Sequence, residues 1–147
     1  AVKSRTAFRE YWGNPESTEK AFADGWFLTG DIAVVDEGAY RILGRASIDI
    51  IKSGGYKLSA LEIEATLLEH PDVSEVAVIG VPDDERGEIV AAAVVLANPV
   101  SEDDLVQWSR ERMSGYKVPR KWIFTDALPR NALGKVTKPS LSAWFEG

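Results

Sequence analysis

Two long apolar segments place the tightest limit on the fold of this chain. Val73–Val81 and Ile89–Leu96 are rich in valine, isoleucine and alanine, and a polar stretch, Pro82–Gly87, separates them. Apolar runs of this length that are bounded by turn residues are typical of buried β-strands. The pair therefore predicts two buried strands joined by a polar loop.

Helical segments flank these strands. Ser59 and Glu62 form a capping-box pattern that opens a helix of about three turns, which Pro71 ends. Ser101 caps a second helix over residues 102–113. The side chains expected to face inward from it are Leu105, Val106 and Trp108. Both helices have apolar residues at helical spacing, so each is expected to cover the sheet.

Three further segments complete the pattern from residue 48 onward. A ribbon of two short strands surrounds Gly54-Gly55, Lys121–Phe124 is a third strand of the sheet, and residues 139–145 form a last short helix. The order is two strands, a helix, two strands, a helix, a strand and a helix. This order predicts an α+β fold, with a small mixed sheet and flanking helices.

The residues before position 45 have a different character. Asn14 and Pro15 open a short helix over residues 15–24, and a hairpin follows with strands at 32–35 and 39–43. We expect a boundary near Arg45–Asp49. The chain starts without a methionine and without a leader pattern, so we also expect it to continue a longer protein, although a trimmed N-terminus would look the same.

The composition excludes several classes of function. The chain has no cysteine and one histidine, so a thiolate site and a multi-histidine metal site are excluded, and we assign no metal ligand. Its 17 Lys and Arg residues are scattered and outnumbered by 23 Asp and Glu residues, which argues against a nucleic-acid partner. No apolar run is long enough for a membrane span. The five tryptophans are interpreted as core residues.

Two charged residues near the expected boundary have open interpretations. Thr29-Gly30-Asp31 is a common turn sequence, and turn statistics favour a structural role. Alternatively, the Asp31 carboxylate accepts hydrogen bonds from vicinal hydroxyls such as those of a ribose. Arg45 is either a solvated charge at a domain edge or a second contact to ribose or phosphate.

Two glycine-containing segments are also ambiguous when taken alone. Gly54 and Gly55 permit close approach of a ligand to the backbone, or simply form a tight turn. The segment does not have the spacing of a Walker phosphate loop. Tyr116 lies between cations in Gly115–Arg120, so it is placed to stack on a base beside phosphates, although Gly115 also suits a helix C-terminus.

The segment Leu128–Lys138 carries the sharpest chemical signal. A glycine, Gly134, precedes Lys135, so the loop can extend an ammonium group into a cleft. A lysine charge binds both carboxylate and phosphate oxygens and can hold an acid and a phosphate in reacting geometry. A surface lysine that is only solvated is the alternative.

The order and spacing of these segments strongly resemble the adenylate-forming superfamily, which contains acyl-CoA synthetases, luciferases and peptide-synthetase adenylation domains. The segments that carry the resemblance are Gly25–Asp31, Gly44–Glu64, Val76–Asp83 and Pro129–Val136. The match covers nearly the whole chain, and residues 45–49 and 57–64 are most similar to the malonyl-CoA synthetase branch.

The resemblance implies a fold and a division of the chain. Residues 1–44 would be the end of the large N-terminal AMP-binding domain, of which a β-hairpin remains. Residues 45–49 would be a hinge, and residues 50–147 the C-terminal mobile lid domain. The hinge position would be Ser47, where this family often has Asp or Lys; a small polar residue can also absorb the backbone change.

The resemblance also implies roles for single residues. Lys135 would be the catalytic lysine, which enters the site for adenylation and leaves it for thioester formation. The nucleotide-binding residues would be Asp31 and Arg45. The CoA-binding residues would be Ser53, Gly54, Gly55, Tyr116 and Lys117, of which the first three line the pantetheine tunnel.

The implied activity is that of an acid–CoA ligase, an AMP-forming enzyme whose substrates are ATP, CoA and a small carboxylic acid. Mg²⁺ would be bound mainly by the upstream N-terminal domain, so this part alone is expected to be inactive. The alternatives are an adenylation domain that loads a carrier-protein phosphopantetheine, and a non-catalytic CoA-binding module. The expected location is the cytoplasm, with an organellar matrix as the alternative.

Overall fold

The computed structural model describes residues 1–146 and divides the chain into two compact units, Ala1–Ile42 and Leu43–Gly147. The first unit contains α1 (Pro15–Ala21), β1 (Phe22–Ala23), β2 (Trp26–Phe27) and β3 (Asp31–Asp36). As expected, the Asn14 side chain caps α1 by accepting a hydrogen bond from the Ser17 N–H, at 3.0 Å.

The first helix is shorter than the sequence predicts. It ends at Ala21, and the next two residues form β1, which pairs with β2 across a turn at Asp24 and Gly25. Both turn residues have a positive φ, at 49° and 76°. The tight turn therefore pulls Phe22 out of the helix and places its ring 5.5 Å from that of Phe27. The predicted hairpin is confirmed, because β3 pairs with β4 (Ala39–Arg45).

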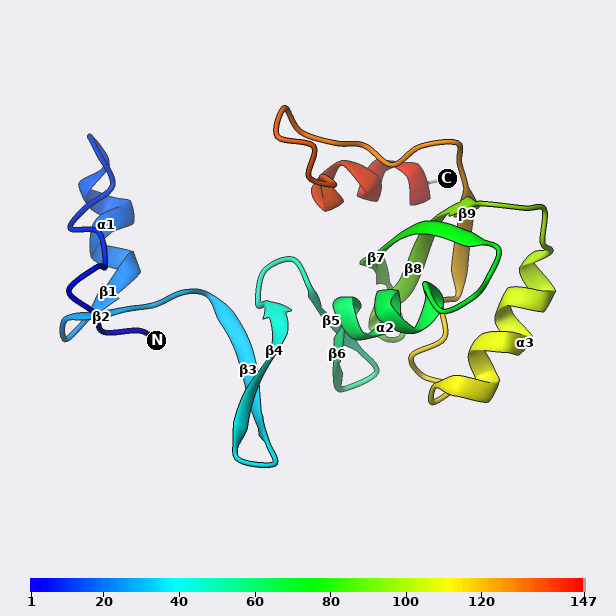
Figure 1. Cartoon of the computed structure of the whole chain (residues 1–147), viewed down its shortest axis with the longest axis horizontal. Helices are drawn as coiled ribbons and strands as arrows, with labels where there is room; N and C mark the ends of the chain where they lie inside the picture. Colours follow the sequence, from blue (N-terminus) through cyan, green and yellow to red (C-terminus); the bar gives the residue numbers. More distant parts are fainter. Residues whose placement is uncertain (147) are drawn as a thin grey trace. The chain divides into compact units, whose positions relative to one another are not determined.

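The second unit is built on one five-stranded sheet (Figure 1). Its elements are β5 (Ile50–Ser53), β6 (Tyr56–Ser59), α2 (Ala60–Leu67), β7 (Val73–Asp83), β8 (Gly87–Leu96), α3 (Glu102–Arg112), β9 (Lys121–Phe124) and the 3₁₀-helix η1 (Lys138–Phe145). The strand order is β6-β5-β8-β7, and β9 pairs with β8 in parallel while the other pairs are antiparallel. This confirms the predicted α+β fold with a small mixed sheet and flanking helices.

Alternate residues of β7 and β8 feed two separate cores, one on each face of the sheet. Val78 lies opposite Ala92 and packs in the core that contains Ile63 of α2 and Leu105 of α3. Ile79 lies opposite Ala91 and packs in the other core. That second core also contains Leu128, Leu141 and Phe145. Both strands are apolar on both faces because helices cover one face, and η1 with its preceding loop covers the other.

The two predicted helix starts in this unit are confirmed. The Ser59 hydroxyl accepts the Glu62 N–H at 3.1 Å, and the Ser101 hydroxyl accepts the Asp104 N–H at 3.1 Å. Within α3, Leu105 is buried as expected, whereas Val106 and Trp108 are only half-buried. A serine at position 109 is fully buried instead, because its hydroxyl donates to the Leu105 carbonyl at 2.6 Å and needs no other partner.

The expectation that all five tryptophans lie in the core is wrong. Three of them are exposed: Trp12, at 94%, Trp26 and Trp144. Trp122 is half-buried at the edge of a core, where its indole N–H donates to the Pro119 carbonyl at 3.1 Å. An indole ring carries a donor that must be satisfied, so the edge of a core suits it better than the centre. The short first unit has too little chain to bury its own two tryptophans.

Replacing Leu67 with alanine is expected to destabilise the second unit by about 2–5 kcal/mol, because the removed side chain leaves a cavity in the core. Leu67 is 0% exposed, whereas its neighbour Leu68 is 48% exposed and serves as the matched control. Urea denaturation of the chain, followed by circular dichroism, measures the unfolding midpoints of the Leu67→Ala and Leu68→Ala variants. Equal midpoints for Leu67→Ala and Leu68→Ala would contradict the described core.

Candidate functional site

The loop before η1 is a hydrogen-bonded hairpin. Arg130 and Val136 form a β-bridge, and the Thr137 N–H donates to the Pro129 carbonyl at 2.8 Å. At the tip, the Asn131 side-chain oxygen accepts the N–H groups of Leu133 and Lys135, each at 3.0 Å. The Arg130 guanidinium donates to the Gly134 carbonyl and pairs with Glu75 of β7. Hydrogen bonds within the hairpin therefore hold the backbone around Lys135, and Arg130 links the hairpin to β7.

The side chain of Lys135 is exposed to solvent. Among residues 1–146, its ammonium group forms no ion pair or hydrogen bond. An internal acid that neutralised this amine would have excluded a role in binding anions. The structure instead presents a positive charge on a rigid backbone support, which suits electrostatic contact with carboxylate or phosphate oxygens.

The turn between β5 and β6 lines a cavity together with the segment after α3. Gly54 and Gly55 have φ values of 56° and 85°, which glycine adopts without strain, so the tight turn forms as predicted. A cavity of about 180 Å³ lies beside Ser53, Gly54 and Tyr116. Its other lining residues are Tyr56, Arg86, Gly115 and Arg120. The structure thus brings together three of the five residues predicted to bind CoA, while Gly55 lies in the same turn.

An aromatic pair and two guanidinium groups characterise this cavity. The rings of Tyr56 and Tyr116 stack with their centroids 4.6 Å apart and their planes 6° apart. Arg86 is held near the turn because its carbonyl accepts the Gly54 N–H at 3.0 Å. Arg86 and Arg120 therefore place positive charge beside an aromatic surface. This combination suits a ligand that has both phosphates and a planar ring.

Lys117, the fifth predicted residue, is engaged elsewhere. Its ammonium group lies 2.8 Å from the Glu62 carboxylate. Glu62 was expected to complete the capping box of α2, but its carboxylate pairs with Lys117 instead. In the described residues, the direct contacts of Lys117 tie the segment after α3 to α2.

The expected hinge is a tight turn closed by a carboxylate. The Asp49 N–H donates to the Arg45 carbonyl at 2.8 Å, and the Arg45 N–H donates to Asp49 Oδ2 at 2.9 Å. Gly44 has a φ of 128°, and a Cβ at this position would overlap the Asp49 side chain. The turn therefore requires glycine at position 44. Ser47, the predicted pivot, lines a separate cavity of about 230 Å³ with Lys138 and Pro139.

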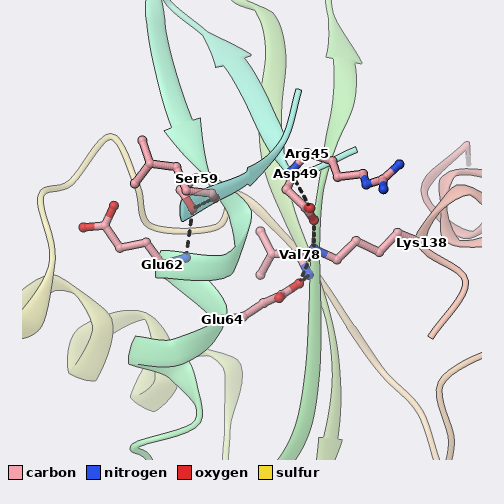
Figure 2. A network of polar contacts seen from close by, with 8 residues as sticks. Arg45, Asp49, Ser59, Glu62, Glu64, Val78 and Lys138 are labelled. Carbon is pink, nitrogen blue, oxygen red and sulfur yellow. Dashed lines mark hydrogen bonds and ion pairs between the residues drawn. The ribbon is translucent and has the colours of Figure 1, made fainter. Parts of the chain in front are cut away.

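A nearly buried charge network lies behind this turn (Figure 2). The Lys138 ammonium group lies 2.7 Å from Asp49 Oδ1 and 2.8 Å from Glu64 Oε1, and the three side chains are only 12–13% exposed. Glu64 also accepts the Val78 N–H at 2.7 Å. Figure 2 shows the Lys138 side chain extended between the two carboxylates, whereas the Arg45 guanidinium points away from them. The cation thus joins the turn, α2 and the start of η1, and Glu64 links it to β7.

The network contains two carboxylates but only one ammonium group, and all three side chains have little access to water. Desolvation raises the pKa of Glu64, and it outweighs the opposing effects of the Lys138 charge and hydrogen bond and of the Val78 N–H. The Asp49 charge raises this pKa further. The cation is therefore essential to this arrangement, because it is the partner shared by both acids.

The remaining predicted residues are the first and the last residue of the β3–β4 hairpin. Asp31 is the first residue of β3, and its N–H donates to the Thr29 hydroxyl at 3.2 Å. Arg45 is the last residue of β4. The two belong to different units, so their shared role in nucleotide binding stays a prediction. The contributors to the candidate site that were not predicted are Arg86 and Tyr56 at the cavity, and Lys138 with its acidic partners.

The described residues do not fit a metal centre. No group of three or more His, Cys, Asp and Glu side chains in residues 1–146 is placed to hold a metal ion. The acids of the nearly buried network are instead paired with Lys138. Across the same residues, no helix has the length and apolar character needed to cross a membrane.

Comparison with known proteins identifies relatives over most of the chain. The mitochondrial malonate–CoA ligase of Mus musculus is 50% identical over 143 residues, which is 95% of this chain and 24% of the ligase. A long-chain-fatty-acid–CoA ligase of Mycobacterium tuberculosis is 46% identical over 141 residues, which is 95% of this chain and 28% of that protein. The chain thus spans about a quarter of the length of these relatives.

A solved structure confirms the likeness in three dimensions. The o-succinylbenzoate CoA synthetase of Bacillus subtilis, in complex with its acyl-adenylate intermediate, superimposes with a TM-score of 0.88 at 36% identity. The match covers 95% of this chain and 29% of the synthetase. The relatives are acid–CoA ligases, and this chain corresponds to their C-terminal part. Residues 62–135 match the model of the AMP-binding enzyme C-terminal domain, and the chain belongs to that family.

Proposed function

We propose that this chain is the C-terminal part of an acid–CoA ligase, in which residues 50–147 form a mobile lid and residues 45–49 its hinge. The complete protein would activate a carboxylic acid with ATP and then transfer the acyl group to CoA. The observation that carries the proposal is the placement of Lys135, an exposed ammonium group without a partner in residues 1–146, on a hairpin with a fixed backbone.

In the first half-reaction, a carboxylate oxygen of the acid attacks the α-phosphorus of ATP. The bond from this phosphorus to the pyrophosphate oxygen breaks, which gives acyl-AMP and pyrophosphate. Negative charge is crowded at the reacting phosphate, and the Lys135 ammonium group would be delivered there to stabilise it. The fixed hairpin backbone supports this role because the charge does not have to be reorganised during the reaction.

In the second half-reaction, the CoA sulfur attacks the acyl carbonyl carbon and the bond to AMP breaks, which gives the thioester, AMP and a proton. The lid would rotate about Ser47, so that Lys135 leaves and the turn at Ser53–Gly55 enters. The cavity at this turn supports the proposal, because Tyr116, Arg86 and Arg120 surround it with an aromatic surface and positive charge. Its size, about 180 Å³, suits part of a CoA molecule rather than the whole.

The proposal divides the remaining binding roles between this chain and an upstream domain. Asp31 and Arg45 would hold the ribose of the nucleotide, while Mg²⁺ and the acid would bind to an upstream N-terminal domain. The names of the relatives specify different acids, malonate and long-chain fatty acids. We therefore propose only that the substrate is a carboxylic acid. We retain the cytoplasm as the proposed location, with an organellar matrix as the alternative that the mitochondrial relative favours.

Replacing Lys135 with alanine in the full-length protein is expected to lower the rate of acyl-AMP formation by about 100-fold or more, the effect of removing one preorganised charge or donor. Thioester formation from supplied acyl-AMP should stay within about threefold, because this step does not use Lys135. ATP–pyrophosphate exchange and single-turnover thioester formation measure the two steps. Lys20→Ala, at another exposed lysine, is the control. Equal losses in both half-reactions would exclude the role of Lys135.

Replacing Arg120 with alanine is expected to raise the KM for CoA by about tenfold, because one charge-assisted contact to phosphate is lost. ATP–pyrophosphate exchange should not change, since it does not involve CoA. Arg41→Ala, which removes an exposed arginine paired with Asp36 in another region, is the matched control. An unchanged KM for CoA in the Arg120 variant would show that this cavity does not bind the CoA phosphates.

A further inference from the structure

We propose that Asp49 and Lys138 couple the turn at residues 45–49 to the hairpin that carries Lys135, which makes Lys138 a positioning residue for adenylation. The inference rests on the proposed function, because Lys138 would act through Lys135. It assigns a role to a nearly buried cation that neither half-reaction uses directly.

The two oxygens of Asp49 serve two different parts of the unit. Oδ2 accepts the N–H of Arg45, at the opposite end of the turn, at 2.9 Å. Oδ1 lies 2.7 Å from the ammonium group of Lys138. Any change in the turn that moves Arg45 relative to Asp49 therefore acts on the same carboxylate that holds Lys138 (Figure 2).

The second acid fixes Lys138 to the rigid part of the unit. Glu64 lies on α2, and Oε1 accepts both the Lys138 ammonium at 2.8 Å and the Val78 N–H of β7 at 2.7 Å. The partners are 12–13% exposed, so water competes little with these contacts. Lys138 thus contacts the turn through Asp49 and is linked to the core through Glu64.

The chain segment from Lys138 to Lys135 is short, and its backbone is held by hydrogen bonds. Two residues, Val136 and Thr137, separate the two lysines. The three backbone steps from Lys135 to Lys138 span at most about 11 Å in an extended chain. Val136 is bridged to Arg130, and the N–H of Thr137 donates to the Pro129 carbonyl at 2.8 Å. A displacement of the Lys138 backbone therefore passes to the hairpin that supports Lys135. An error of about 1 Å in a reacting group can lower a rate by about 100-fold.

The test uses Lys138→Met in the full-length ligase, which keeps most of the side-chain length and removes the charge. We expect ATP–pyrophosphate exchange to fall at least tenfold in kcat, while thioester formation from supplied acyl-AMP stays within about threefold. Lys138→Arg, which keeps the charge, should recover most of the exchange rate. The matched control is Lys121→Met, a lysine of β9 that donates to the Phe145 carbonyl outside the network.

A double-mutant cycle separates positioning from a general structural role. If Lys138 acts through Lys135, adding Lys138→Met to Lys135→Ala should cause no further loss of exchange. A fully additive loss, or equal losses in both half-reactions of the single variant, would overturn the proposal. Should Lys138→Met not fold, Asp49→Asn replaces it: its amide oxygen can still accept the Arg45 N–H, and the same selective loss is expected.

Two outcomes distinguish this inference from the proposed function. If Lys135→Ala retains exchange, the proposed function fails and the inference fails with it. If Lys135→Ala loses exchange while folded Lys138→Met and Asp49→Asn retain it, only the coupling through Asp49 is excluded.

Discussion

The second unit depends for its functional geometry on the contacts of one nearly buried ammonium group, that of Lys138. It lies between Asp49 and Glu64, two acids that reach it from the expected hinge and from α2. Without this cation, two carboxylates would face each other with little access to water, which is unfavourable. The raised pKa of Glu64 shows that burial already opposes its charge. The position of the expected hinge relative to the hairpin that carries Lys135 therefore depends on one cation that two acids share.

In the second unit, the packed framework and the exposed groups proposed to bind substrates are formed by different segments. Apolar residues on both faces of β7 and β8 hold the sheet between two cores. The groups proposed to bind substrates lie on loops outside the sheet: Lys135 is on its hairpin, and Tyr116 is beside the glycine turn. Fixed backbones with exposed side chains suit a domain that would present two different surfaces to one reaction centre. The framework would move as a body while the local geometry stays intact.

Local sequence signals predicted most of the framework. The apolar runs gave the central strands, and Ser59 and Ser101 gave the helix starts, because these features depend on neighbouring residues alone. Trp12 and Phe22 were misjudged because burial and pairing depend on the surrounding tertiary structure. The roles of Lys138 and Arg86 could not be derived locally, since their partners lie far away in the sequence. Glu64 offered one signal: it shares the apolar face of α2 with Ala60, Ile63 and Leu67, and a carboxylate placed there requires a partner.

In the proposed mechanism, Lys135 is delivered to a nucleotide for one half-reaction and withdrawn for the other. The most direct measurement is the rate at which an amine-acylating reagent modifies Lys135 in the full-length protein, followed by mass spectrometry. With ATP and a non-reactive analogue of the acid, we expect strong protection of Lys135 but not of Lys20. With a stable acyl-AMP analogue and CoA, we expect the reactivity of Lys135 to return. Equal reactivity of Lys135 in the two states would exclude its delivery and withdrawal.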